Sequence, residues 1–497
     1  MEYIDNKDKA AYKSLITCLK KHRKGLTAAD ITIKTALPLE NVRELLPAAA
    51  DEYSARLRVT ESGEILYSFP NGFKSKYRGI RAVLARFFET AAVITKTAAV
   101  NLFKLWILVM LVGYFMLFVL IAFASVIFAI AVQSSSKRDK DDSRGGFIIV
   151  THILDLIIRI WFYSELVKSF DSRHDGWRNT IKPKTRPLYK AVFSFVFGEG
   201  DINAGTITRE RQAVLAYIRE SGGIISLPEF MILTGKSPAE AEESITAFCT
   251  AYNGSPEATE DGTVVYRFEE LLFNTGKNQS SALYSGPVYK LNIFSSNEKK
   301  FNRWFSVLNM VNLLFGAYFT LNTLYINIMA NIDSEQAYVY SLVYKFTEKV
   351  IGTTAYPVML WWLGLVPLTF SILFWLIPFI RNKILKKNNE RIKFINFRQF
   401  ACNTIWKNPV NITAGALNPT DPSSRPLHFK KAQDAVITEL SAYYPVKIEA
   451  NDSGEFRYSF EDLEWEKTSL KKHRALVKTR TLGNVIFDSG ETESNHS

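Results

Sequence analysis

Residues 255–268 read SPEATEDGTVVYRF, and the same pattern occurs in residues 57–69, LRVTESGEILYSF, and in residues 446–460, VKIEANDSGEFRYSF. In each stretch a glycine is followed by an apolar residue two positions later, a tyrosine four positions later and a phenylalanine six positions later. The matching residues are Gly63, Ile65, Tyr67 and Phe69; Gly262, Val264, Tyr266 and Phe268; and Gly454, Phe456, Tyr458 and Phe460. Apolar residues at every second position are typical of a strand with one buried face, and Ser-Gly or Asp-Gly before them favours a hairpin turn. We therefore expect one β-hairpin that occurs three times.

Helix signals precede the first two hairpins in the same order. Apolar residues at helical spacing predict a first helix in each copy; they are Tyr12, Leu15, Ile16 and Leu19, and Val214, Tyr217 and Ile218. Capping-box patterns at Thr27 and Ser226 predict the second helix, and each lies 36 residues before its hairpin glycine. Pro38 in the first copy and the Ser237 cap in the second copy predict the third helix. Three helices followed by a two-stranded wing indicate a winged-helix domain.

The third copy is looser than the other two. Residues 397–406 supply a candidate first helix, and Thr413 begins the next element 41 residues before Gly454. The insertion 418–426, rich in Pro, Ser and Asp, accounts for the longer interval. We expect a third winged-helix-like domain here.

Long apolar segments separate these domains. Residues 105–132 form a run of 28 residues without a charge, and residues 147–167, 304–330 and 356–380 are three further apolar segments. A helix needs about 20 apolar residues to span a bilayer. The sequence therefore predicts four transmembrane helices in two hairpins that alternate with the three domains, in a protein that is mainly α with small β-hairpins.

The charges beside these segments predict their orientation. Residues 74–104, 168–190 and 381–398 each carry seven Lys or Arg against one or two acids, whereas residues 133–146 and 331–352 are nearly balanced. The positive-inside rule places both termini and the central domain in the cytoplasm. We expect an integral protein of a bacterial inner membrane or its plastid equivalent, with basic flanks that set the topology or also attract anionic lipid.

The expected organisation follows from these assignments. Its parts are winged-helix-like domains at 1–73, 207–272 and 396–466; transmembrane hairpins at 105–167 and 304–380; a basic juxtamembrane helix at 74–104; a basic linker at 168–206; a linker at 273–303; a basic juxtamembrane segment at 381–395; and a basic, then disordered, tail at 467–497.

Polar residues within the apolar segments are candidate functional residues. His152, Asp155 and Arg159 share one helical face of the second segment, as either a self-neutralising pair or a proton relay. A polar stripe on the third segment includes Asn309, Asn312 and Asn327. Such residues hold membrane helices together more often than they bind a substrate. These residues support a small transporter only as an alternative.

A winged helix also raises the question of nucleic-acid binding. The predicted third helix at 39–53 has one Arg against four acids, and that at 238–252 has no basic residue. Phosphate neutralisation supplies most nucleic-acid affinity, so acidic recognition helices disfavour it. The exception is a basic run, Lys20, Lys21, Arg23 and Lys24, which would suit anionic lipid or nucleic acid. A membrane-tethered nucleic-acid-binding regulator is therefore a second hypothesis.

The sequence contains no nucleotide-binding, zinc-protease or nucleophile-elbow motif, and its cysteines, Cys18, Cys249 and Cys402, are far apart. We expect no cofactor or metal and no enzymatic activity. The leading hypothesis is an interaction or assembly platform for a protein partner.

Residues 191–203, AVFSFVFGEGDIN, together with residues 209–212 and 256–268, resemble a family of multi-span membrane proteins found mainly in cyanobacteria and chloroplasts. Some of its members are labelled as an iron-sulphur cluster biosynthesis family. The resemblance supports the architecture and the membrane type. It implies no catalytic residue, and three isolated cysteines offer no set of cluster ligands.

Overall fold

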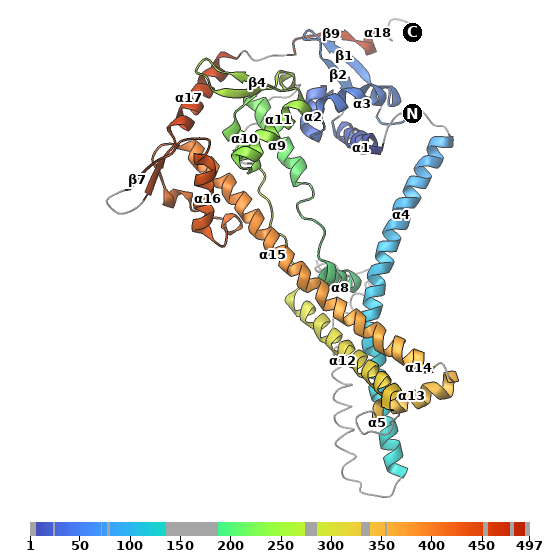
Figure 1. Ribbon diagram of the computed structural model, residues 1–497. Helices are drawn as coiled ribbons and strands as arrows, with labels where there is room; N and C mark the ends of the chain where they lie inside the picture. The colour runs from blue at the N-terminus through green and yellow to red at the C-terminus, as the bar shows by residue number, and fades with distance from the viewer. Residues whose placement is uncertain are drawn as a thin grey trace, which may run out of the picture. The chain divides into compact units, whose positions relative to one another are not determined.

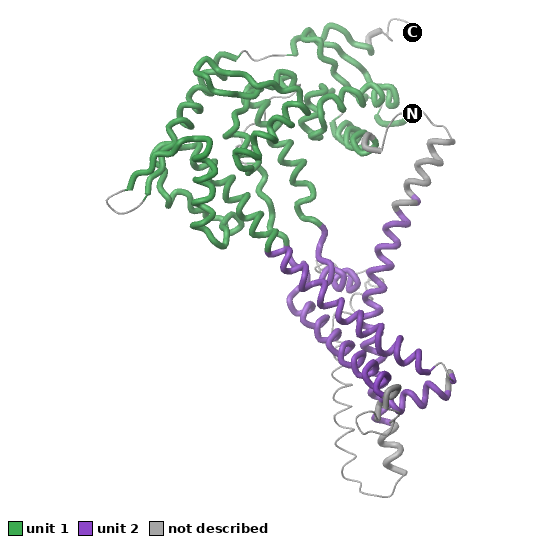
Figure 2. Tube along the Cα trace, in the orientation of Figure 1, with its two compact units in different colours: residues 1–86, 201–292, 387–497 green, residues 87–200, 293–386 purple. Residues whose placement is uncertain are grey.

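The computed structural model of the protein describes residues 6–22, 25–70, 72–76, 80–135, 187–273, 286–329, 338–352, 355–450, 456–477 and 482–492. These residues are mainly helical with small antiparallel sheets (Figure 1). The chain divides into two compact units (Figure 2), unit 1 with residues 1–86, 201–292 and 387–497, and unit 2 with residues 87–200 and 293–386.

Among the described residues, three helices are long and apolar enough to cross a membrane, at Ile94–Ile127, Lys299–Tyr325 and Ala355–Lys407. The first lies within the continuous run of α4 (Ile80–Leu108), the π-helical turn η1 (Val109–Gly113) and α5 (Tyr114–Ser135). The second lies within α12 (Lys299–Met329). The third consists of α14 (Ala355–Pro357), the π-helical η5 (Val358–Leu365) and α15 (Val366–Lys407). They coincide with three of the four expected spans. The fourth, residues 147–167 with His152, Asp155 and Arg159, lies outside the described residues.

In the described part of unit 2, two shorter helices lie in segments expected to be connections. They are α8 (Leu188–Phe197) and α13 (Tyr338–Ile351). Phe195 of α8 packs with Phe305 and Phe374, and Tyr340 of α13 is fully buried beside aromatic residues of α5 and α12. Charge counts placed these segments beside the membrane, but their apolar spacing makes them part of the packed unit.

The helix α15 continues without a break through residues 381–395, which were expected to form a separate juxtamembrane segment. Pro378 lies within the helix, and the next proline or glycine is Pro409. Nothing between them interrupts the backbone hydrogen bonds, so one helix includes both the apolar segment and the first helix expected at 397–406.

Unit 1 contains three sets of elements, each with helices followed by a hairpin. The first has α1 (Asn6–Lys21), α2 (Ala28–Thr35), α3 (Leu39–Glu52), β1 (Arg56–Thr60) and β2 (Ile65–Ser68). The second has α9 (Thr206–Glu220), β3 (Ile224–Ile225), α10 (Leu227–Thr234), α11 (Pro238–Tyr252), β4 (Ser255–Ala258), β5 (Val264–Arg267) and η2 (Glu269–Leu272). The third has the end of α15, β6 (Ile412–Thr413), the 3₁₀ turns η6 (Ala414–Leu417) and η7 (Pro422–Ser424), α16 (Phe429–Ser441), β7 (Lys447–Ala450) and β8 (Phe456–Ser459).

Capping interactions open the helices where they were expected. The hydroxyl of Thr27 accepts a hydrogen bond from the backbone N–H of Asp30, while the Asp30 carboxylate accepts one from the Thr27 N–H. The same reciprocal box opens α11 at Ser237. At the start of α10 the Glu229 carboxylate accepts a hydrogen bond from the Ser226 N–H at 3.2 Å, but the Ser226 hydroxyl has no hydrogen-bond partner among the described residues. In the third set, prolines in the insertion 418–426 leave two 3₁₀ turns in place of the second α-helix.

The sets do not have separate cores. Buried residues of the second and third sets form one continuous cluster, which includes Phe230, Phe268, Phe397 and Phe460 and extends to Ile33 of the first set. Helices α1, α2 and α3 also enclose a smaller core around Leu15 and Phe69. Modules that are distant in sequence therefore pack as parts of one body.

The C-terminal residues differ from the expected disordered tail. Residues Glu461–Leu476 form helix α17, and Val485–Asp488 form strand β9, followed by α18 (Ser489–Thr492). Strand β9 pairs antiparallel with β1 and gives the first sheet the order β2-β1-β9. The guanidinium of Arg56 donates two hydrogen bonds to the Asp488 carboxylate, at 2.6 and 2.9 Å. An exposed strand edge and this bidentate pair order β9, whose residues are apolar except Asp488, within a tail that is otherwise mainly polar.

Candidate functional site

The three hairpins share one apolar face, but that face is buried only at one end. Phe69, Phe268 and Phe460 are fully buried. The apolar residue nearest the turn is exposed in each case, with Ile65 at 37%, Val264 at 54% and Phe456 at 53%. We call these three residues the wing tips. The expectation of one uniformly buried face was therefore wrong at the turn end, because the strands extend beyond the core.

Strand register explains the exposure. Ile65 pairs with Val59, Val264 with Ala258 and Phe456 with Ala450, at the ends of their hairpins next to the turns. Tyr67, Tyr266 and Tyr458 lie one step nearer the core and are half-buried. Gly63 and Gly262 have positive φ values of 80° and 83°, which the turns require, and Gly454 lies outside the described residues.

Helix α17 covers the opposite face of the second hairpin. Val265 is fully buried and packs with Ile224 and Leu470. The hydroxyls of Thr259 and Ser469 are 2.9 Å apart, and both residues are buried. The second hairpin is therefore enclosed on its outer face, while its wing tip is exposed.

A buried ion pair fixes α17 to α10. The guanidinium of Arg474 donates to the two carboxylate oxygens of Glu229, at 2.8 and 2.6 Å, and to the carbonyl of Ile224 at 2.8 Å. Glu229 also accepts a hydrogen bond from the hydroxyl of Tyr217. Glu229 is the acid of the α10 capping box, so the same carboxylate begins a helix and binds the C-terminal helix.

The first two sets are joined at their third helices. The Tyr252 hydroxyl at the end of α11 donates to the carbonyl of Ala36, before α3, at 3.0 Å in a buried position. The side chain of Asn253 donates to Glu40 of α3 at 2.8 Å. One end of α11 therefore contacts the first set.

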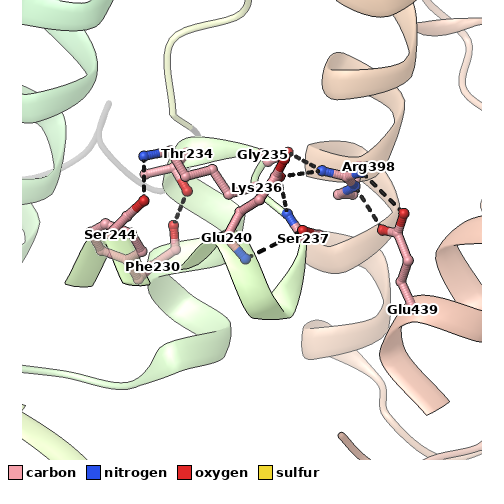
Figure 3. A network of polar contacts seen from close by, with 9 residues as sticks. All are labelled: Phe230, Thr234, Gly235, Lys236, Ser237, Glu240, Ser244, Arg398 and Glu439. Carbon is pink, nitrogen blue, oxygen red and sulfur yellow. Dashed lines mark hydrogen bonds and ion pairs between the residues drawn. The ribbon is translucent and has the colours of Figure 1, made fainter. Parts of the chain in front are cut away.

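Arg398 joins the other end of α11 to the third set (Figure 3). This residue is 8% exposed and lies on α15. Its guanidinium donates to the carbonyl of Gly235 at 3.2 Å, to Glu240 at 3.3 Å and to Glu439 at 3.2 Å. The hydrogen bond from the Ser237 backbone N–H is the main cause that lowers the pKa of Glu240, whereas burial raises the pKa of Glu439. Arg398 belongs to no local sequence motif, because its partners are distant in the chain.

The basic run beside α1 is divided between two environments. The ammonium group of Lys20 lies 6.0 Å from the centre of the Phe73 ring, and Lys21 lines a cleft with Lys13 and Lys34. Arg23 and Lys24 lie outside the described residues. Lys13 and Lys34 lie outside the basic run and were not expected here, although Lys13 and Lys21 lie two helical turns apart on one face of α1.

The polar stripe of α12 contacts other helices of unit 2. The side-chain amide of Asn309 donates to the carbonyl of Ser371 at 2.9 Å, and that of Asn312 donates to the carbonyl of Leu111 at 2.8 Å. Both asparagines are fully buried. A side chain at Gly316 would lie 2.9 Å from the backbone nitrogen of Leu368, so the helices approach closely there. Asn327 lies within α12, but its side chain is not among the parts that the structure describes.

The cysteines are buried and far apart. Cys18, Cys249 and Cys402 are free thiols, and burial raises the pKa of Cys249 to about 11 and that of Cys402 to about 12. Among the residues that the structure describes, no group of three or more His, Cys, Asp or Glu side chains is placed to hold a metal ion.

Comparison with known proteins found a distant relative. The chain is 25% identical over 261 residues to an uncharacterized chloroplastic protein of Arabidopsis thaliana, and the match covers 50% of this chain and 46% of the relative. This chain is thus similar to about half of that protein. No protein-family model and no solved structure matches the chain.

Proposed function

We propose that the protein is a non-enzymatic integral membrane protein whose winged-helix modules form a platform for binding or assembling a protein partner. The observation that carries this proposal is the exposure of Ile65, Val264 and Phe456, the same position in three hairpins. Single exposed apolar residues are common on protein surfaces. Their repetition at one position of three modules of a single body favours contact with a protein.

The element order supports the winged-helix assignment. The second set runs helix, short strand, helix, helix and hairpin, and β3 pairs with β5 to complete a three-stranded sheet. The third set has the same sheet arrangement, with β6 paired to β8. In the first set Leu26 pairs with Tyr67 at the corresponding position.

The placement of α11 supports a protein partner over nucleic acid. A winged helix that reads DNA inserts its third helix into the major groove. Here, Tyr252 and Asn253 at one end of α11 contact the first set, and Glu240 at the other end contacts Arg398. Glu242 and Glu243 are exposed on α11 and would repel phosphates, and Glu242 accepts a hydrogen bond from the Tyr443 hydroxyl of the third set at 3.2 Å.

The expected topology completes the proposal. With residues 147–167 as a fourth span, each membrane hairpin returns the chain to its starting side, and the positive-inside rule makes that side cytoplasmic. Unit 1 would then face the cytoplasm of a bacterium or the equivalent compartment of a plastid. The amide contacts of Asn309 and Asn312 support helix packing and not a transport path.

Copurification tests the proposed function. The triple variant Ile65→Ser, Val264→Ser, Phe456→Ser removes the wing tips without touching the core. Leu427→Ser is the matched control, since Leu427 is 73% exposed in the same unit. After mild cross-linking in native membranes, the wild type and the control should retain a reproducible protein partner, and the triple variant should lose it. Equal retention by the triple variant and the control would refute the proposal.

A further inference from the structure

A cleft in unit 1 collects positive charge between the first and second sets. It has a volume of about 660 Å³. Three helices line it with mainly polar and basic side chains: Lys13, Ser14, Thr17, Lys21 and His22, with Ala10 and Cys18, from the α1 region; Lys34 and Thr35 from α2; and Thr208 and Gln212 from α9. Small-molecule sites have volumes of about 300–1,000 Å³. The helices that form the cleft are labelled in Figure 1.

The described residues that line the cleft supply its lysines with no acidic counterpart. Among them there is no aspartate or glutamate. Within the part of the chain that the structure describes, no ion pair involves Lys13, Lys21 or Lys34. Three ammonium groups that face one cleft repel each other, and a bound anion relieves this repulsion.

The pKa of His22, which also lines the cleft, responds to the charges of the lysines. Burial lowers the pKa of His22, and Lys34 and Lys21 lower it further, opposed by Asp30. The two lysines belong to different helices, so their charges converge on one place. A multivalent anion bound there favours protonation of His22 and gains a further positive partner.

The contacts across the cleft hold its walls together. The side-chain amide of Gln212 on α9 donates to the carbonyl of Lys34 at 2.6 Å. The hydroxyls of Thr17 and Thr35 donate to carbonyls within their own helices, at 2.7 Å each. The Gln212 bond joins α9 to α2, whereas the threonine bonds fix hydroxyl groups within single helices. The walls formed by α2 and α9 are therefore positioned before a ligand binds, which reduces the entropy that binding costs.

We propose that this cleft binds the phosphate groups of a small phosphorylated molecule, which is either a soluble metabolite or the headgroup of an anionic lipid. Lys13, Lys21 and Lys34 contact the phosphate oxygens, and the hydroxyl and amide groups of the lining orient the remainder of the ligand. Lysine binds phosphate as a point charge on a flexible stem, which suits an open cleft. The assignment is independent of the wing tips.

The test uses the full-length protein in detergent and the triple variant Lys13→Gln, Lys21→Gln, Lys34→Gln. The control variant, Lys430→Gln, Lys431→Gln, Lys471→Gln, removes the same charge from exposed positions of unit 1. Titration calorimetry with pyrophosphate at low salt is the first measurement. We expect the cleft variant to bind at least tenfold more weakly than the wild type, and the control to differ by less than about threefold. Replacing the three lysines with arginine should restore binding.

A second measurement distinguishes the two sources of phosphate. The same proteins are placed in nanodiscs of phosphatidylcholine, with or without phosphatidylglycerol, and retained lipid is identified by native mass spectrometry. Loss of bound phosphatidylglycerol in the cleft variant alone assigns the cleft to a headgroup. Binding of pyrophosphate without lipid retention assigns it to a soluble molecule.

Two results would overturn the proposal. One is equal affinity of the cleft variant and the control variant for both probes. The other is tighter binding of a short DNA duplex than of pyrophosphate, abolished by the same three substitutions, since this would make the cleft a nucleic-acid contact.

Discussion

Substituting Arg474 with methionine tests whether α17 is held to the second set by the buried pair with Glu229. Glu229 has only 5% of its side chain exposed, and Arg474 has 25%. Removing one partner of a buried pair costs about 3–5 kcal/mol. Glu229 keeps hydrogen bonds from Tyr217 and from the N–H of Ser226, so we expect the lower end, about 3 kcal/mol.

Hydrogen exchange measured by mass spectrometry gives the free energy for opening α17 directly, without requiring the whole protein to unfold in one step. Arg474→Met should lower it by about 3 kcal/mol, and Glu229→Gln by about 2 kcal/mol because the remaining guanidinium can rehydrate. The double variant should lose about 2 kcal/mol less than the sum of the single variants.

The control for this experiment lies on the same helix. Lys472 pairs with Asp261 at 3.6 Å, and its side chain is 65% exposed, so Lys472→Met should change the opening free energy by less than about 1 kcal/mol. An Arg474→Met effect no larger than that of Lys472→Met, or additive effects in the double variant, would refute the role given to the pair.

Four further outcomes follow from the structure. Burial raises the pKa of Glu466 from 4.5 to about 7, so the native state holds a proton that the unfolded chain releases. Unfolding free energy should therefore fall by up to about 3 kcal/mol as pH rises between these values, and Glu466→Gln should flatten that curve. Phe268→Ala should cost about 3–5 kcal/mol in chemical unfolding, and Leu427→Ala almost nothing. Gly316→Leu should separate α12 from α15 and lower the melting temperature of the detergent-solubilised protein. Gly352→Asn should not, because nothing lies within 4 Å of a Cβ at Gly352 and asparagine tolerates its φ of 71°. Deleting residues 482–497 should increase hydrogen exchange in β1 and leave β4 unchanged.

Local sequence patterns predicted the hairpins and the helix starts because the interactions that form them are local. A glycine with positive φ and a capping box depend on residues within about four positions. The three long apolar helices were equally evident, since span length depends only on composition. The same rules did not predict α8 and α13. Their apolar residues are moderately spaced, and the charges next to them favoured connecting segments.

The arrangement of the modules could not be predicted in this way because it depends on long-range contacts. Asp488 pairs with Arg56 across 432 residues, and neither residue belongs to a motif. Exposure at Val264 and burial at Val265 follow from where α17 lies, and the sequence of two adjacent valines gives no sign of this difference. The cleft likewise combines Lys21, which the basic run indicated, with Lys34 from a helix that looked unremarkable.

The central claim is that the wing tips contact a protein, and site-specific photo-crosslinking in native membranes tests it most directly. A photo-reactive amino acid replaces Val264 or Phe456 in the full-length chain, and Leu427 serves as the control position. We expect a discrete protein adduct from position 264 and from position 456, and none from position 427. Adducts to nucleic acid at the wing tips, or no protein adduct at either position, would contradict it.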